Sequence, residues 1–213
     1  MGDDEITPSL EAAYAVETPD ENRRLYAEWA SSYEETFVAA KAYRYHLHVA
    51  DTLVAHVRPA GPTLDVGCGT GVVGVALRER GVSEIDGVDI SPDMIDKARE
   101  KGDYRKLMQA DLTADYSHVP TNYAAIVSSG TFTFGHLGPE LIPGMVGLCR
   151  SGAVAALGVN STYFAEQGFR SVLDSLEEEG QIGNVSLHEM PIYDGRDAAH
   201  KDDTAMILAF TTL

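Results

Sequence analysis

A glycine-rich turn carries the clearest chemical signal in the sequence. The segment LDVGCGTG spans residues 64–71, where a short apolar run contains Asp65 and turns through Gly67, Gly69 and Gly71 into a helical pattern. Glycine tolerates positive φ angles and lets a ligand approach the backbone closely. The N–H groups at the start of the helix favour the negatively polarised end of a bound molecule. The turn therefore predicts a cofactor site at the carboxyl end of a strand.

The same turn is compatible with two different cofactors. Residues 69–74 also satisfy the GxGxxG pattern of nicotinamide dinucleotide-binding proteins, and Asp89 follows about 20 residues later, where that pattern requires an acid. Three features favour a ligand without phosphates instead. The tight turn begins earlier, at Gly67, Asp65 would repel a pyrophosphate, and a second acid, Asp111, follows a later strand.

The elements around the turn alternate between strand and helix. Hydrophobic periodicity predicts two helices, 20–32 and 37–57, before the first strand, and a hairpin of strands 185–192 and 204–212 at the end. Between them it predicts strands at 63–66, 85–90, 105–110, 123–129 and 153–159 and helices at 70–80, 92–101, 139–149 and 164–179. This order predicts an α/β Rossmann-like fold with a seven-stranded mixed sheet, mostly parallel with a C-terminal antiparallel hairpin, and helices on both faces.

The length of 213 residues fits one globular domain. Residues 1–19 contain several acids, two prolines and little periodicity, so we expect a mobile acidic lead-in. Residues 20–213 are expected to form a single domain, with residues 20–57 as an N-terminal helical lid.

The charge balance argues against nucleic acid and membranes as partners. The chain has 16 Lys and Arg against 33 Asp and Glu, a formal charge of −17, whereas phosphate backbones are bound by clustered cations. No run approaches the roughly 18–20 apolar residues that span a bilayer, and we expect a cytoplasmic protein. Cys68 and Cys149 form no disulfide framework, and the spacing of His46 and His48 predicts no metal site.

Three segments together resemble the class I S-adenosylmethionine-dependent methyltransferases over about residues 20–160. They are LDVGCGTG, GVDIS with Asp89, and MQADL with Asp111. In that family the glycine loop lies against the methionine part of the cofactor, the acid ending the second strand binds both ribose hydroxyls, and the acid after the third strand meets the adenine amino group. The resemblance thus assigns Asp89 to ribose and Asp111 to adenine. The remaining residues expected at the cofactor are Tyr33, Asp65, Gly67, Cys68, Gly69, Gly71, Ile90, Met94, Leu112 and Ser128.

Two further segments narrow the resemblance. Residues 26–33, YAEWASSY, are similar to the YxxWAxxY segment of a subgroup that includes the Williams-Beuren-syndrome-region methyltransferase-like proteins, and residues 128–137 resemble that subgroup's fourth-strand region. An aromatic helix can cover the mouth of the site and exclude water, with Tyr33 as the expected contact. The alternative is a helix that only packs its Trp and Tyr side chains.

The residues that end the fourth predicted strand indicate which class of methyl acceptor to expect. It ends in Ser-Ser-Gly at 128–130 and lacks the Asn-Pro-Pro-Tyr type of ending found in many enzymes that methylate bases. His136 follows this strand and is the candidate catalytic residue, a base for an acceptor that keeps its proton at neutral pH. The alternative is a hydrogen-bonded loop histidine.

We therefore expect a methyltransferase that uses S-adenosylmethionine, releases S-adenosylhomocysteine and acts on a small-molecule acceptor. Two other functions stay open. One is a non-catalytic protein that binds S-adenosylmethionine or S-adenosylhomocysteine, and the other is a NAD-dependent oxidoreductase.

Overall fold

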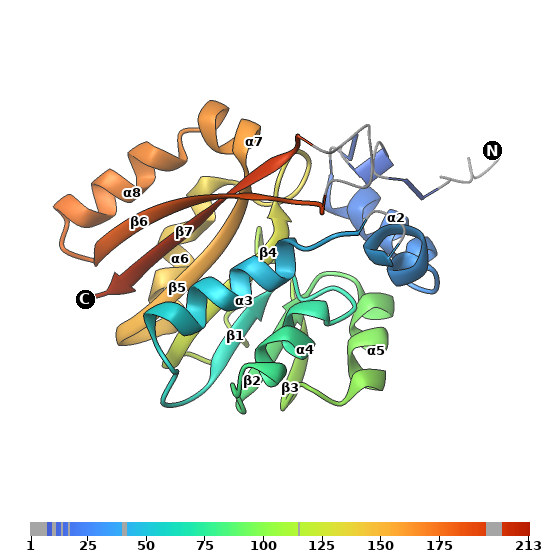
Figure 1. The fold of residues 1–213 in the computed structure, drawn as a ribbon, viewed down its shortest axis with the longest axis horizontal. Coiled ribbons are helices and arrows are strands. Elements are labelled where there is room, and N and C mark those ends of the chain that lie inside the picture. Colours follow the sequence, from blue (N-terminus) through green and yellow to red (C-terminus); the bar gives the residue numbers. More distant parts are fainter. Residues whose placement is uncertain are drawn as a thin grey trace.

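A twisted sheet runs through the centre of the computed structural model, with helices against both of its faces (Figure 1). The structure describes residues 8–9, 12–13, 15–16, 18–39, 42–114, 116–194 and 202–213. The strands are β1 (Thr63–Val66), β2 (Ile85–Asp89), β3 (Lys106–Gln109), β4 (Tyr123–Phe132), β5 (Cys149–Asn160), β6 (Ile182–Pro191) and β7 (Thr204–Thr212). Among the described residues, seven strands pair in the order β3-β2-β1-β4-β5-β7-β6.

The sheet is mixed, as the hydrophobic pattern predicts. Strands β3, β2, β1, β4 and β5 pair in parallel, and β7 pairs antiparallel with both β5 and β6. The predicted Rossmann-like fold and its terminal hairpin are therefore confirmed. The strand order reverses beside β1, and open sheets of this kind bind ligands at the carboxyl ends of the strands that flank the reversal.

Two groups of helices cover opposite faces of the sheet. Helices α3 (Tyr45–His56) and α4 (Val72–Glu79) share one hydrophobic core, and α6 (Ile142–Leu148) and α8 (Phe169–Glu178) share the other. Further helical elements in the described residues are α2 (Pro19–Trp29), the π-helix η1 (Glu34–Ala39), α5 (Pro92–Lys101), the 3-10 helix η2 (Pro139–Leu141) and α7 (Ser161–Glu166).

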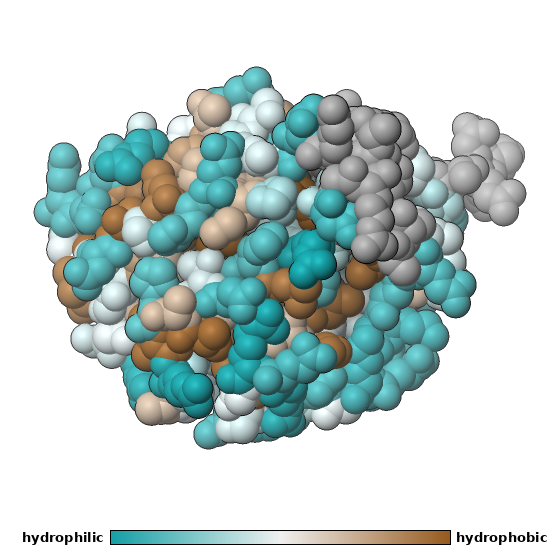
Figure 2. Space-filling view, viewed as in Figure 1, coloured by the Kyte–Doolittle hydropathy of each residue, from teal (hydrophilic) through white to brown (hydrophobic). Residues whose placement is uncertain are grey.

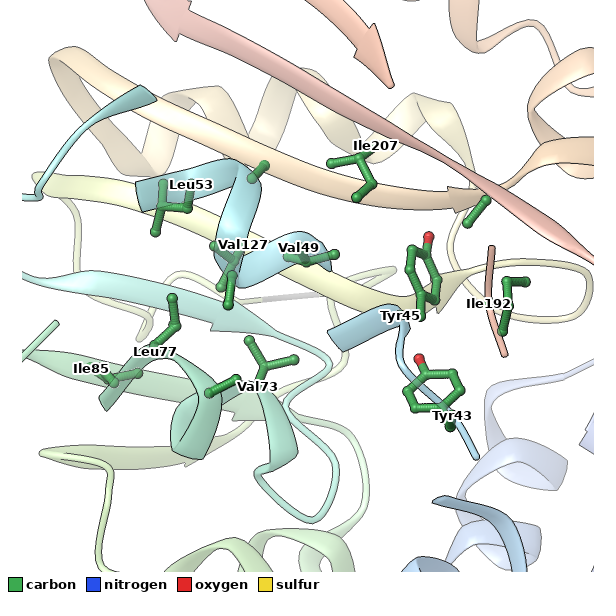
Figure 3. Close-up of a cluster of buried hydrophobic side chains, with 14 of the residues drawn as sticks. Tyr43, Tyr45, Val49, Leu53, Val73, Leu77, Ile85, Val127, Ile192 and Ile207 are labelled. Atoms are coloured by element: carbon green, nitrogen blue, oxygen red, sulfur yellow. The ribbon is translucent and has the colours of Figure 1, made fainter. Parts of the chain in front are cut away.

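Branched aliphatic side chains build the core beneath α3. Val49 and Leu53 point from α3 toward Val127 of β4, and Val73 and Leu77 approach from α4 (Figure 3). All five are buried, and full burial of such a side chain contributes about 1.5–3 kcal/mol. This layer holds α4 in place, and with it the glycine turn that precedes α4.

Local sequence signals determine where helix α5 begins and ends. Its bounds match the predicted 92–101, because the Ser91 hydroxyl accepts the Met94 N–H at 3.3 Å and Gly102 ends the helix with a φ of 75°. Hydrophilic side chains cover this edge of the molecule (Figure 2), whereas Met94 on the inner side is buried. The helix therefore presents Met94 toward the carboxyl end of β2.

The predicted helix at 37–57 is wrong in its first half. The structure has the π-helix η1 at 34–39, and α3 begins only at Tyr45. Between them, Tyr43 forms an antiparallel bridge with Tyr193, and the Arg44 N–H donates to the Ile192 carbonyl at 2.9 Å. These long-range backbone bonds tie residues 43–44 to residues 192–193 and interrupt the helix.

The predicted helix at 164–179 is also interrupted. It divides into α7 and α8 at Gly168, whose φ of 76° lies in the left-handed region. Strands β4 and β5 are longer than predicted, at 123–132 and 149–160. The longer β4 brings Gly130, Thr131 and Phe132 into the strand itself.

Most of the predicted lead-in at residues 1–19 lies outside the described residues. Of the part that the structure describes, Ala13 and Val16 are buried. A Cβ added to Gly135 would lie 1.9 Å from the Val16 carbonyl oxygen. This short section therefore packs directly on the loop after β4.

Tyr104 connects α4 to the end of the first strand. Its hydroxyl accepts the Gly74 N–H at 3.0 Å and donates to Asp65 Oδ2 at 2.6 Å. A Cβ on Gly74 would lie 2.4 Å from the Tyr104 ring. Gly74 thus provides the space for a ring that hydrogen-bonds to a buried carboxyl group.

Gly74→Ala is expected to lower the free energy of unfolding by about 1–3 kcal/mol, because the new methyl overpacks against Tyr104. Helix propensity alone predicts the opposite sign, since Ala is favoured over Gly by about 1 kcal/mol in a helix interior. Gly147→Ala in α6 is the matched control, because no atom beyond its chain neighbours and its own helix backbone lies within 4 Å of its Cβ position. Urea denaturation should show loss of stability for the first variant and none for the second, and equal effects would contradict the packing described.

Candidate active site

A cavity of about 420 Å³ lies at the carboxyl ends of β1, β2 and β4. It falls in the usual range of small-molecule sites, about 300–1,000 Å³. Its lining combines the glycine turn, the ends of three strands and side chains of α2. The described lining residues are Asn22, Tyr26, Tyr33, Gly67, Gly69, Val88, Asp89, Ile90, Met94, Ala110, Asp111, Leu112, Thr113, Ser129, Gly130, Thr131, Gly135, His136 and Leu137.

The glycine turn has the backbone conformation that its sequence predicts. Gly67, Gly69 and Gly71 have φ angles of 65°, 51° and 90°, which other residues rarely adopt. A Cβ on Gly67 would lie 2.1 Å from the Thr131 hydroxyl oxygen. Gly67 and Gly69 line the cavity, and Gly71 caps the start of α4 behind it.

Asp89 joins the turn to the end of β2. Its Oδ2 accepts the Gly69 N–H and its Oδ1 accepts the Ser91 N–H, both at 2.8 Å. Burial raises the pKa of this carboxyl, and the backbone bonds act in the opposite direction. Each carboxylate oxygen can accept more than one hydrogen bond. Asp89 can therefore hold the turn and still accept two hydroxyl groups of a ligand in the cavity.

An apolar part of the lining extends from the end of β2 to the loop after β3. Ile90, Met94 and Leu112 line the cavity there together with Asp111. Asp111 Oδ1 accepts the N–H and the hydroxyl of Thr113, at 2.9 and 2.6 Å. Apolar side chains beside an oriented carboxylate suit a planar ring that carries a hydrogen-bond donor.

Asp65 lies behind the turn rather than in the cavity lining. It is fully buried, and burial raises its pKa to about 7, although the Tyr104 hydrogen bond lowers it. Its Oδ1 has no hydrogen-bond partner in the described part of the chain. Asp65 thus acts on the site through Tyr104 and the backbone of the turn.

Two other predicted residues also lie behind the cavity wall. Cys68 is buried, and the Ser128 hydroxyl donates to the Val66 carbonyl at 2.8 Å. Because successive strand side chains point to opposite faces, Ser129 faces the cavity instead. The predicted small hydroxyl group is therefore present one position later, where Ser129 Oγ lies 3.0 Å from the Tyr43 hydroxyl.

Aromatic side chains from α2 and from the residues that follow it line one side of the cavity. Tyr26 and Tyr33 line it, and Trp29 packs between them with ring-centroid distances of 6.0 and 5.1 Å. A capping box of Thr18 and Glu21 starts α2. Helix α3, the second half of the predicted lid, packs on the sheet instead.

One lysine links the lid region to the turn. The Lys101 ammonium at the end of α5 hydrogen-bonds to the Glu34 carboxylate of η1 and to the Thr70 carbonyl. The same side chain therefore contacts η1, next to Tyr33, and the backbone that leads into α4. This arrangement ties the aromatic cover to the cofactor turn.

His136 also lines the cavity, and its hydrogen bonds define its tautomer. Nδ1 lies 2.9 Å from the Phe134 carbonyl, which can only accept, so Nδ1 carries the proton. Burial lowers the pKa of His136, which favours the neutral ring at pH 7. Nε2 is then an acceptor, and the Tyr26 hydroxyl donates to it at 3.2 Å. The histidine presents a basic lone pair at the cavity wall.

A second, smaller hollow of about 60 Å³ adjoins the first. Both include Tyr26, Tyr33, Gly130 and His136 in their linings.

Two other kinds of site were sought in the described residues. No group of three or more His, Cys, Asp or Glu side chains is placed there to hold a metal ion. Nor does this part of the chain contain a helix with the length and apolar character needed to cross a membrane.

Sequence comparison adds an independent observation. Residues 63–151 match the family model described as a methyltransferase domain. The chain is also 28% identical to methyltransferase-like protein 27 of Homo sapiens over 184 residues, which cover 83% of this chain and 74% of that protein. Together these two matches support assignment to the class I S-adenosylmethionine-dependent methyltransferases. The predicted resemblance is therefore confirmed at the level of the class.

Solved structures share the fold at low sequence identity. A TehB-like S-adenosylmethionine-dependent methyltransferase from Corynebacterium glutamicum has a TM-score of 0.62 and 20% identity, over 88% of this chain and 98% of that one. The [4+2]-cyclase SpnF has a TM-score of 0.67 and 13% identity, over 93% and 97% of the two chains. At these identities the likeness shows the fold alone.

Several lining residues were missed from the sequence. Asn22, Thr113, Ser129, Gly130 and Thr131 line the cavity without having been predicted to do so. The alternation of strand side chains places Ser129 and Thr131 on one face of β4, but it does not specify which face meets the cavity. Asn22 gives no signal of its own, because its position depends on how α2 docks.

Proposed function

We propose that the cavity binds S-adenosylmethionine and that this methyltransferase acts on a small molecule. The observation that carries the proposal is the Asp89 carboxylate, which bonds to Gly69 and Ser91 and lines the cavity at the end of β2. A ribose diol offers the two hydroxyl donors that such an acceptor pairs with. Asp111 and Leu112 would then hold the adenine, and the turn at Gly67 and Gly69 would face the methionine part.

Bound S-adenosylmethionine supplies a methyl group on a good leaving group. The chain's own contribution is alignment and exclusion of water, and correct alignment contributes up to several kcal/mol. The turn and Asp89 orient the cofactor on one side of the cavity. The rings of Tyr26 and Tyr33 line another side and exclude water. The acceptor has space beside Ser129 and Gly130, on the side of the cavity away from Asp111.

A small acceptor agrees with the size and charge of the site. The cavity of about 420 Å³ is lined on one side by the rings of Tyr26 and Tyr33, so the space beside a bound cofactor is limited. The formal charge of −17 disfavours phosphate backbones. Both features favour a metabolite over a nucleic acid.

Turnover with methyl-labelled S-adenosylmethionine and a panel of metabolites carrying hydroxyl, thiol, amine and carboxylate groups tests the proposal. The expected result is label in one class of small molecule and release of S-adenosylhomocysteine, both dependent on the chain. Label only in protein or RNA would contradict the small-molecule acceptor. Tight binding with no transfer to any compound would favour the non-catalytic alternative.

Tyr33→Ala tests the aromatic cover. We expect S-adenosylmethionine affinity to fall about tenfold, equivalent to about 1.4 kcal/mol, because a ring that can contact a sulfonium and packs on Trp29 is lost. Tyr33→Phe keeps the ring and should stay close to the wild-type protein. Calorimetric titration measures both variants. Unchanged affinity and turnover in Tyr33→Ala would mean that the segment only packs.

A further inference from the structure

We propose that the methyl acceptor is an uncharged compound with a hydroxyl nucleophile, that it extends into the aromatic chamber beside the cofactor cavity, and that His136 Nε2 accepts its proton. The aromatic chamber is the smaller hollow, whose lining includes Tyr26, Trp29, Tyr33, Tyr43, Phe132 and Tyr193. This inference rests on the proposed methyl transfer and specifies its substrate class.

The shape of the chamber limits what enters it. An engineered cavity of about 150 Å³ holds benzene, so about 60 Å³ holds only part of a small molecule. Because Tyr26, Tyr33, Gly130 and His136 belong to both linings, one acceptor can occupy the chamber and the adjoining end of the cavity. Its reacting atom then lies on the side of His136, and an apolar part lies among the rings.

The described lining of the aromatic chamber favours an uncharged acceptor. Among the described residues, the chamber lining contains no Asp, Glu, Lys or Arg. A buried ammonium or carboxylate group needs an oppositely charged partner. The carboxylates of the large cavity, Asp89 and Asp111, lie at the ends of β2 and β3, where the proposed function assigns them to the cofactor. An ionic acceptor would therefore be desolvated without compensation.

A buried hydroxyl group in the chamber indicates that the ligand carries a polar atom. Thr133 lines the chamber and is 7% exposed, and its Oγ1 has no hydrogen-bond partner in the part of the chain that the structure describes. A buried hydroxyl left unpaired costs about 1–3 kcal/mol. The Thr133 carbonyl accepts the His136 N–H at 3.1 Å, so the unpaired group and the basic histidine belong to one tight turn.

The proton needs a destination because a neutral hydroxyl is a weak nucleophile. The O–H bond breaks as Nε2 of His136 takes the proton, the new O–CH₃ bond forms, and the bond from that methyl to sulfur breaks with its electrons on sulfur. The positive charge passes from the sulfonium to the imidazolium, which then releases its proton to solvent. The Nδ1–H bond to the Phe134 carbonyl makes Nε2 the accepting atom, and the hydroxyl of the methyl acceptor replaces the Tyr26 hydroxyl that bonds to Nε2 in this structure.

Four small compounds with different nucleophiles test the inference: phenol, thiophenol, benzylamine and benzoate. Calorimetry without methyl donor should show binding of phenol and none of benzylamine or benzoate. With methyl-labelled donor, His136→Gln should reduce methylation of phenol about 100-fold, the usual contribution of a general base. Methylation of thiophenol should fall less than about threefold, because thiols ionise near neutral pH without a base.

Two further variants keep the test sharp. His56→Gln is the matched control, since His56 bonds to the Thr52 carbonyl at the far end of α3 and should change neither reaction. Thr133→Val should weaken phenol binding about two- to tenfold, the loss of one hydrogen bond, and should leave S-adenosylmethionine binding unchanged.

The outcomes separate this inference from the proposed function. Failure of S-adenosylmethionine to bind overturns the proposed function. Cofactor binding with transfer only to benzylamine or benzoate, or with no binding of phenol, overturns this inference alone. Equal losses for phenol and thiophenol in His136→Gln would assign His136 a purely structural role and also overturn it.

Discussion

Replacing Asp89 with alanine is expected to weaken S-adenosylmethionine binding about 5- to 150-fold, which corresponds to about 1–3 kcal/mol. The variant removes the acceptor proposed for the ribose hydroxyls, which are then left unpaired in a closed cavity. It also releases the N–H groups of Gly69 and Ser91, which Asp89 holds at 2.8 Å. Loss of ligand contact and loss of turn geometry therefore act in the same direction.

Calorimetric titration measures this effect directly. Asp89→Asn keeps one oxygen acceptor and should fall between alanine and the wild-type protein. Asp174→Ala is the matched control, because that carboxylate pairs with Arg170 on α8 and its side chain is 48% exposed. Affinity that is the same in the wild-type protein and Asp89→Ala would rule out the ribose assignment.

Asp65 is expected to make the protein less stable as the pH rises from about 4 to 7. In the unfolded chain this carboxyl ionises near its ordinary pKa of 3.8, whereas burial raises its pKa to about 7 in the folded protein. Between these values the unfolded state loses a proton that the folded state keeps. The stabilisation is therefore complete below pH 4 and is lost as the pH rises through 7.

The size of this effect follows from the pKa difference. Each unit corresponds to 1.36 kcal/mol, so Asp65 alone lowers the free energy of unfolding by up to about 4 kcal/mol between pH 4 and 7. Asp65→Asn removes the titration and keeps an acceptor for the Tyr104 hydroxyl. Urea denaturation of both proteins should show that the variant gains stability relative to the wild-type protein as the pH rises. A constant difference across this range would contradict the raised pKa.

Local signals explain which parts of the fold were predictable. Ser91, Pro92 and Gly102 mark both ends of α5, and its predicted bounds are correct. The interruption near Tyr43 depends on the Ile192 carbonyl, about 150 residues away in the chain, and no local pattern contains that information. The break at Gly168 was readable in principle, because a glycine within a helical pattern can adopt a left-handed φ.

In the candidate site, too, some residues were predictable from the sequence and others depended on long-range contacts. Asp89 and Asp111 were predictable because strand ends of a parallel sheet converge on one edge. Ser128 and Ser129 were not distinguishable, since their orientation depends on the register in which Ser128 pairs with Val66. The proximity of Tyr26 to His136 required the docked position of α2, which hydrophobic periodicity does not specify.

The central claim is that the cavity beside Asp89 binds S-adenosylmethionine. Its most direct test is a calorimetric titration of the wild-type chain with S-adenosylmethionine and, in parallel, with NADH. The predicted result is one molecule of S-adenosylmethionine per chain, displaced by S-adenosylhomocysteine and unaffected by NADH. Binding of NADH without binding of S-adenosylmethionine would contradict the account and favour the dinucleotide interpretation of the glycine turn.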